Sequence, residues 1–154
     1  MEFDIEVEMA ERGALRDTYA AALQHELVDL DGDERLIGVA RRPLPWLLGQ
    51  VDENRSALGP PPELLDAVKE RHEELQKDGL PDAEAHNRAL EAVDYRERYL
   101  DYLENSAAPR EAIESIEEIR EAGTDVVLVC YENTAEKRCH RTILREAIEA
   151  GLLD

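Results

Sequence analysis

The chain has 154 residues, 43% of them hydrophobic, which is enough to build a globular core. Its 37 acidic residues against 18 basic ones give a formal net charge of −19, which argues against general attraction to nucleic acid. No apolar run approaches the ~20 residues of a membrane span, and the first residues lack the basic start and apolar centre of a signal peptide. We therefore expect one cytoplasmic domain over residues 1–154, without membrane contact.

The first third of the chain alternates regular elements with turns. Residues 4–8 alternate apolar and acidic side chains and predict a short edge strand. The spacing of apolar residues over 15–27 predicts a helix, and the acidic stretch 29–34 predicts a turn. That turn lacks the closing Glu of a calcium loop. Residues 36–40 predict a strand, and Pro43 and Pro45 prevent it from continuing.

The middle of the chain is predominantly helical. Pro62 and Glu63 predict the start of a helix that runs to about Lys77, where Asp78 and Gly79 end it. A second helical region begins at 80–82 and continues through 103. A third helix, 109–122, carries one apolar stripe and ends at a glycine.

The last third of the chain predicts a strand followed by a helix. Residues 126–131 contain a short β-branched run bounded by polar residues, typical of a buried strand. Helical spacing then covers 142–150 and ends at Gly151. Because helices and strands alternate here, we predict an α/β fold: a small, at least partly parallel sheet packed with about five helices in a single layered domain.

The excess of carboxylates has a simpler explanation than a basic partner. Only three of the 18 basic residues are lysines, and alanines are abundant. This composition is typical of proteins from salt-loving organisms, whose carboxylates keep the surface hydrated where salt screens charge. We therefore predict a halophilic protein in which any anion site must be built locally.

Residues that can carry chemistry gather between 125 and 141. If strands 36–40 and 126–131 are parallel neighbours, their carboxyl ends lie at one edge of the sheet, where α/β proteins usually bind ligands. The residues expected to meet there are Arg41, Arg42, Cys130, Glu132, Cys139, His140 and Arg141. A helix beginning near His140 would also direct free N–H groups into this space. Together these parts predict a pocket for an anionic small molecule.

Each residue of this group has a chemical use and a structural one. Cys139 is a candidate nucleophile, since a helix N-terminus beside Arg and His favours the thiolate. His140 is a candidate acid or base, or else a capping residue. Glu132 is a candidate base, or else the partner of an arginine. Cys130 lines the pocket or fills the core.

The arginines are candidate ligands for the anion, and a metal is the rival assembly. The planar fork of Arg141 matches phosphate or carboxylate, with Arg41 or Arg42 on the neighbouring strand. Cys130, Cys139 and His140 could instead hold zinc, but their spacing fits no standard zinc pattern. The nine-residue separation of the cysteines does not predict a disulfide in a cytoplasmic chain. We therefore expect no metal and no cofactor.

The segment 128–132, followed by Cys139-His140-Arg141, resembles the domain-of-unknown-function 488 family. Members of that family commonly end in a strand reading Leu-Cys-x-Glu, a short loop and Cys-His-Arg at a helix start. The resemblance implies a polar site at Cys130, Glu132 and 139–141, with an arginine from 41–42. It implies no established activity. Residues 1–30 lack the Gly-His-Ser-like turn that many members carry.

Three functions stay open at this point. The first is an enzyme acting on a phosphorylated or nucleotide-like small molecule, with Cys139, His140 or Glu132 performing the chemistry. The second is a non-catalytic module that binds a nucleotide or another anion. The third is a nucleic-acid-associated protein, for which the sequence carries no strong signal.

Overall fold

A computed structural model describes residues 13–131 and 139–151. Three short strands lie in the first third of this described part, and four consecutive helices separate them from the last strand. In chain order they are β1 (Leu15–Tyr19), α2 (Ala20–Gln24), β2 (Arg35–Gly38), α3 (Pro45–Leu48), β3 (Glu53–Asn54), a 3-10 turn (Ser56–Leu58), α4 (Pro62–Lys77), α5 (Asp82–Ala92), α6 (Tyr95–Asn105), α7 (Ala107–Glu121), β4 (Val126–Cys130) and α8 (His140–Glu149). The strand predicted at 4–8 lies outside the described residues.

The four strands form one sheet in the order β1-β4-β2-β3, and each pair is parallel. The register places Tyr19 opposite Cys130 on one side of β4, and Gly38 opposite Val129 on the other. The predicted α/β class is therefore confirmed, and the parallel pairing of 36–40 with 126–131, on which the predicted pocket depended, is present. All carboxyl ends meet at one edge, as in other parallel sheets.

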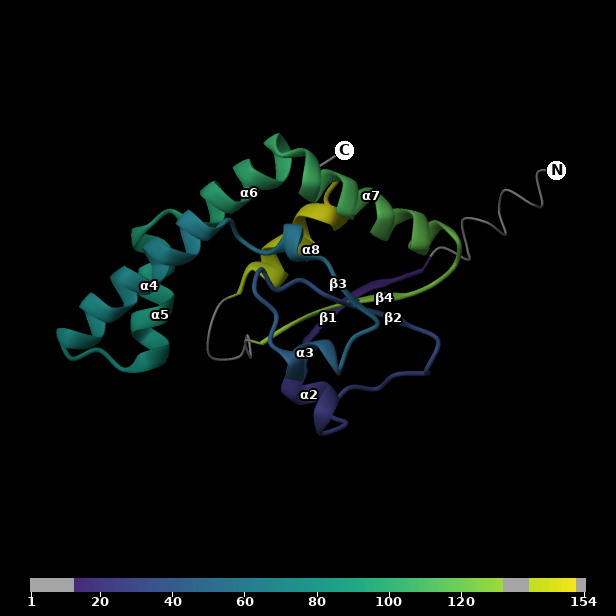
Figure 1. Ribbon diagram of the computed structural model, residues 1–154, viewed down its shortest axis with the longest axis horizontal. Helices are drawn as coiled ribbons and strands as arrows, with labels where there is room; N and C mark the ends of the chain where they lie inside the picture. Colours follow the sequence, from purple (N-terminus) through teal and green to yellow (C-terminus); the bar gives the residue numbers. More distant parts are fainter. Residues whose placement is uncertain (1–12, 132–138, 152–154) are drawn as a thin grey trace.

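Helices cover both faces of the sheet (Figure 1). The side chains of β4 alternate between two cores, as the two-residue period of a strand requires. Val126, Leu128 and Cys130 belong to the core built with α4 to α8. Val127 and Val129 belong to a smaller core with Leu47 of α3. A central strand buried on both faces explains the continuous apolar run in the sequence.

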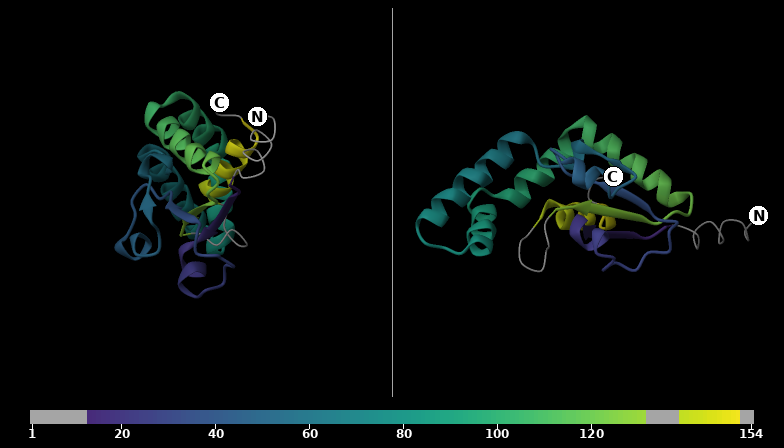
Figure 2. Two further views of the ribbon diagram at one scale, coloured as in Figure 1. Left: turned by 90° about the vertical axis from the view of Figure 1, so that its right-hand side faces the viewer. Right: turned by 60° about the horizontal axis from the view of Figure 1, so that its bottom comes forward.

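The pair α4–α5 projects beyond the carboxyl edge of the sheet (Figure 2). The helix α6 leads back from this pair, and α7 runs along the sheet. As a result, one space at this edge is surrounded by several elements. They are the first turn of α8, the ends of β2 and β4, and the inner faces of α4 to α6. None of the helices in the described part of the chain combines the length and apolar character that crossing a bilayer requires.

One helix prediction needs correction. The helix predicted over 15–27 is wrong for 15–19, which form β1, and only 20–24 are helical. Pairing with β4 overrides the local spacing, and Thr18 and Tyr19 suit a strand. The helical region predicted from 80–82 through 103 consists of two helices, α5 and α6, because the backbone turns at Asp94, whose φ of 54° is left-handed.

Candidate functional site

A cavity of about 240 Å³ lies at the carboxyl edge of the sheet. We call it the edge cavity. It is bounded by the ends of β2 and β4, the start of α8, and the inner faces of α4 to α6. Residues lining it include Arg41, Arg42, His86, Cys130, Cys139 and His140. Five of the seven residues predicted from the sequence to share a pocket therefore line one cavity.

The two cysteines meet at the wall of the edge cavity. Cys130 ends β4 and Cys139 immediately precedes α8, and their Sγ atoms lie 2.7 Å apart as free thiols. The hydrogen bond to Cys139 and burial raise the pKa of Cys130 well above its ordinary value. Cys130 therefore keeps its proton. Either thiol can donate to the other, and Cys130 is the donor when Cys139 is a thiolate. A thiolate at Cys139 would be further stabilised by the N-terminus of α8.

His140 is held as a neutral base beside Cys139. Its Nε2 lies 2.6 Å from the carbonyl oxygen of Val39, which can only accept, so Nε2 carries the proton. Burial, chiefly, lowers the pKa of His140 below 6.5, and the charges of Arg141 and Arg41 contribute. The remaining Nδ1 then presents a lone pair, 3.5 Å from the Cys139 Sγ. Proton transfer from the thiol to Nδ1 is geometrically available.

Stability should fall below neutral pH because His140 is neutral in the folded state. An unfolded His140 takes up a proton near pH 6.5, whereas the folded one does so only at lower pH. Acid therefore favours the unfolded chain, by up to about 1.4 kcal/mol per pH unit for one proton. The free energy of unfolding can be measured in urea at pH 8 and at pH 5. Between these two pH values it should fall less for His140→Gln than for the wild type. Equal slopes for the two proteins would contradict this assignment.

Arg141 is buried within the protein rather than presented to the cavity. It is 1% exposed; its Nε donates to Asp17 at 3.0 Å and its Nη1 to the carbonyl of Thr18 at 2.5 Å. The same Nη1 lies 3.3 Å from the Cys130 Sγ. Arg145 also donates to Asp17, at 2.9 Å. The fork predicted to hold an external anion thus ties α8 to β1 and orients the thiol pair.

The two arginines after β2 have different surroundings. Arg41 donates to the carbonyls of Gly59 and Pro60 and to the hydroxyl of Tyr102, all within 3.0 Å. Arg42 is exposed and lines the edge cavity. Within the described part of the chain, no hydrogen bond or ion pair engages the Arg42 guanidinium. Of these two arginines, Arg42 is therefore the one whose guanidinium has no partner among the described residues.

Sequence reasoning overlooked several residues that position this site. The carboxamide of Asn54 bonds both the N–H and the carbonyl of Ala40, which fixes the chain just before Arg41. This contact requires Gly38, because a Cβ there would lie 2.5 Å from the Asn54 Oδ1. Asp17 and His86 were also missed. Asp17 stands between Arg16 and Thr18 in a segment predicted to be helical, so no local pattern pointed to its contact with α8.

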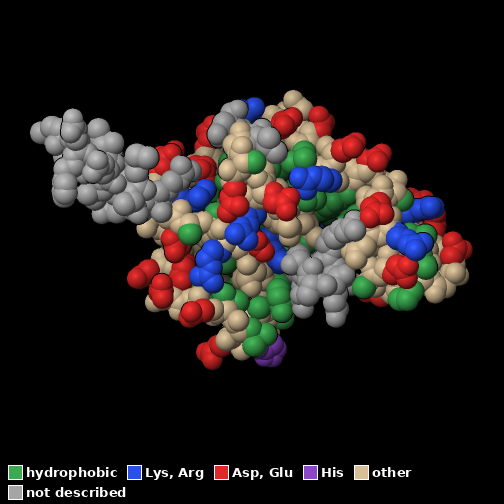
Figure 3. Space-filling model, turned by 180° about the vertical axis from the view of Figure 1, so that it is seen from behind, with side chains coloured by type: hydrophobic (Ala, Val, Ile, Leu, Met, Phe, Trp, Pro, Cys, Tyr) green, Lys and Arg blue, Asp and Glu red, His purple; other side chains and the backbone are tan. Residues whose placement is uncertain are grey.

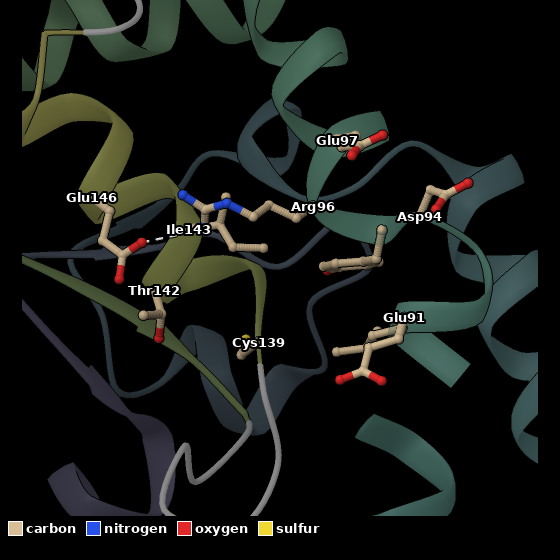
Figure 4. A pocket seen from close by; sticks show the side chains of 10 residues that line it. Glu91, Asp94, Arg96, Glu97, Cys139, Thr142, Ile143 and Glu146 are labelled. Carbon is tan, nitrogen blue, oxygen red and sulfur yellow. Dashed lines mark hydrogen bonds and ion pairs between the residues drawn. The ribbon is translucent and has the colours of Figure 1, made fainter. Parts of the chain in front are cut away.

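A second hollow, the helix groove, lies between α6 and α8 and reaches Cys139 (Figure 4). Its volume is about 630 Å³, and its lining includes Leu90, Tyr95 and Ile143. Arg96 and Glu146 join across it at 3.2 Å. Figure 3 shows apolar side chains in a hollow on this face, with acidic and basic side chains scattered around it. Cys139 therefore lines two cavities, although it is only 6% exposed.

Glu132 lies outside the described residues. Within residues 13–131 and 139–151, no group of three or more His, Cys, Asp or Glu side chains is arranged to hold a metal ion.

Fold and site together define an α/β protein with a cysteine pair and a neutral histidine at the carboxyl edge of a parallel sheet. The family model DUF488-N3a, described as the active DUF488-N3 subclade, matches residues 18–152. The chain therefore belongs to this DUF488 family, as the motif around Cys130 and Cys139 predicted. No curated protein and no solved structure is similar enough to the chain to count as a match.

Proposed function

We propose that the protein is an enzyme in which Cys139 attacks a phosphorylated or nucleotide-like small molecule held in the edge cavity. The observation that carries this proposal is the position of the Cys139 Sγ, between the Cys130 thiol and the Nδ1 of His140. Such a thiol can lose its proton to a neutral base and keep a hydrogen bond from a neighbouring thiol. This is the arrangement that activates a cysteine nucleophile.

Each residue has a distinct part in this mechanism. His140 accepts the proton of Cys139 and can return it to a leaving group. Cys130 donates to the Cys139 sulfur, and Arg141 holds Cys130 in place. Arg42 binds the anionic group of the substrate, with the charge of Arg41 nearby. Glu132 stays a proposed second acid or base.

Binding and turnover of a panel of sugar phosphates and nucleoside monophosphates test the proposal. Arg42→Ala should weaken binding by about ten-fold or more, since it removes a charge-assisted hydrogen bond. Cys139→Ser should bind normally and turn over nothing. The control is Arg88→Ala, whose exposed guanidinium pairs with Glu84 and should not change binding.

Other outcomes separate the alternatives. Arg42-dependent binding without any change in the ligand would indicate a non-catalytic binding module. Normal turnover by Cys139→Ser would contradict the role of the thiol. Binding of nucleic acid that outcompetes every small anion would favour the third function.

The acidity of the chain determines how these assays are run. We propose that the net charge of −19 reflects salt adaptation, so binding should be measured from low to molar KCl. A local anion site should keep its Arg42 dependence at every concentration at which the protein is folded.

A further inference from the structure

The cysteine pair carries an inference beyond its use in nucleophilic attack. The Sγ atoms of Cys130 and Cys139 lie 2.7 Å apart, and a disulfide bond measures about 2.05 Å. The two sulfurs therefore need to approach by less than about 1 Å to bond. They come from different elements, the end of β4 and the residue before α8, so the fold itself brings them together.

The two thiols are unequal in the way that a redox pair requires. Cys139 lines both the edge cavity and the helix groove, and its sulfur faces the lone pair of His140. Cys130 lines only the edge cavity of these two, is 2% exposed, and receives a hydrogen bond from Arg141. Cys139 is thus the sulfur that a small oxidant meets first, and Cys130 is the sulfur behind it. An attacking thiolate beside a resolving thiol is the usual arrangement in redox-sensitive cysteines.

We propose that Cys130 and Cys139 form a reversible disulfide when the protein meets a peroxide, and that this disulfide switches the site off. The inference rests on the proposed function, because both use Cys139 as the nucleophile. In the first step the Cys139 sulfur attacks one peroxide oxygen, the O–O bond breaks, and hydroxide leaves as Cys139 becomes a sulfenic acid. In the second step the Cys130 sulfur attacks the Cys139 sulfur, and the S–O bond breaks. The departing hydroxide takes up the Cys130 proton as water.

The overall change is balanced. The two thiols lose two electrons and two protons, and one hydrogen peroxide becomes two waters. A dithiol reductant reverses the bond by exchange, in which its own sulfurs become a disulfide. While the disulfide exists, Cys139 cannot act as a thiolate nucleophile. Turnover therefore stops although the protein stays folded.

Mass spectrometry and thiol counting test this on the full chain. The reduced protein is treated with stoichiometric hydrogen peroxide, denatured in maleimide and weighed. We expect the wild type to lose the mass of two hydrogens and to accept no maleimide. After treatment with dithiothreitol, both cysteines should again accept maleimide. Bridging should be about ten-fold or more faster in the native protein than in guanidinium, because folding holds the sulfurs in contact.

Two variants separate bridging from simple oxidation. Cys130→Ser should stop at a sulfenic acid on Cys139, detected as the mass of one added oxygen and trapped by dimedone. Cys139→Ser should keep its Cys130 thiol at the same dose. Retention of both thiols in the wild type, bridging no faster than in guanidinium, or linkage between chains would overturn the inference.

Turnover is not the readout, so the two proposals fail separately. If the disulfide forms but the protein turns over no compound of the panel, only the proposed enzymatic function is contradicted. A protein that shows Cys139-dependent turnover but keeps both thiols under peroxide contradicts only the switch.

Discussion

Replacement of Asp17 by Ala is expected to lower the free energy of unfolding by about 3–5 kcal/mol, the usual cost of breaking a buried ion pair. Asp17 accepts from two arginines of α8, and one of them, Arg141, is 1% exposed. Without that carboxylate, the buried guanidinium of Arg141 loses the ion pair that joins α8 to β1. Small domains are stable by only about 5–15 kcal/mol, so the loss should be obvious in urea unfolding followed by circular dichroism.

The matched control is Glu149→Gln. Glu149 also pairs with Arg145, but both side chains are well exposed, so its loss should cost about 0.5 kcal/mol or less. Both variants remove one negative charge, which separates burial from net charge. Adding Arg141→Met to Asp17→Ala should recover part of the stability, because the buried charge that Asp17 paired with is then gone. Equal effects of the Asp17 and Glu149 variants would show that the buried pair carries no special stability.

The sequence predicted the parts of the fold that rest on long apolar patterns. The helix from Pro62 to Lys77 and the strand beginning at Val126 have unambiguous periods and end signals, and both are confirmed. The strand β1 was missed because Leu15 and Tyr19 are also spaced as on a helix. Only pairing with β4, more than 100 residues away, decides between the two. Short strands such as β3 carry too few residues for any period to be seen.

The residues that meet at the edge cavity could be predicted in large part, but their bonding partners could not. Parallel pairing of β2 with β4 places Arg42 and Cys139 at one cavity, as the position of each after its strand implied. The burial of Arg141 depends on Asp17, which lies on a strand whose spacing also fits a helix. The tautomer of His140 depends on one carbonyl, that of Val39. Such contacts are set by packing, and no local pattern encodes them.

The reactivity of Cys139 is expected to depend on His140. Replacement of His140 by Gln should slow alkylation of Cys139 by iodoacetamide at pH 7 by about a hundred-fold, since general bases contribute about 10²–10⁴. The Gln side chain keeps an N–H donor for the carbonyl of Val39 but has no basic nitrogen for the thiol. Peptide mass mapping should show Cys139 modified before Cys130, whose raised pKa keeps it protonated.

The control for the His140 variant is His86→Gln, because His86 lines the same edge cavity from α5. Its alkylation rate should match the wild type if His140 alone accepts the thiol proton. Unfolding in urea at pH 8 would establish that each variant is folded. If Cys139 is alkylated slowly in His86→Gln but at the wild-type rate in His140→Gln, then His86 rather than His140 is the base. Faster labelling of Cys130 than of Cys139 would reverse the order of the two thiols, and with it the direction of attack in both the proposed catalysis and the disulfide switch.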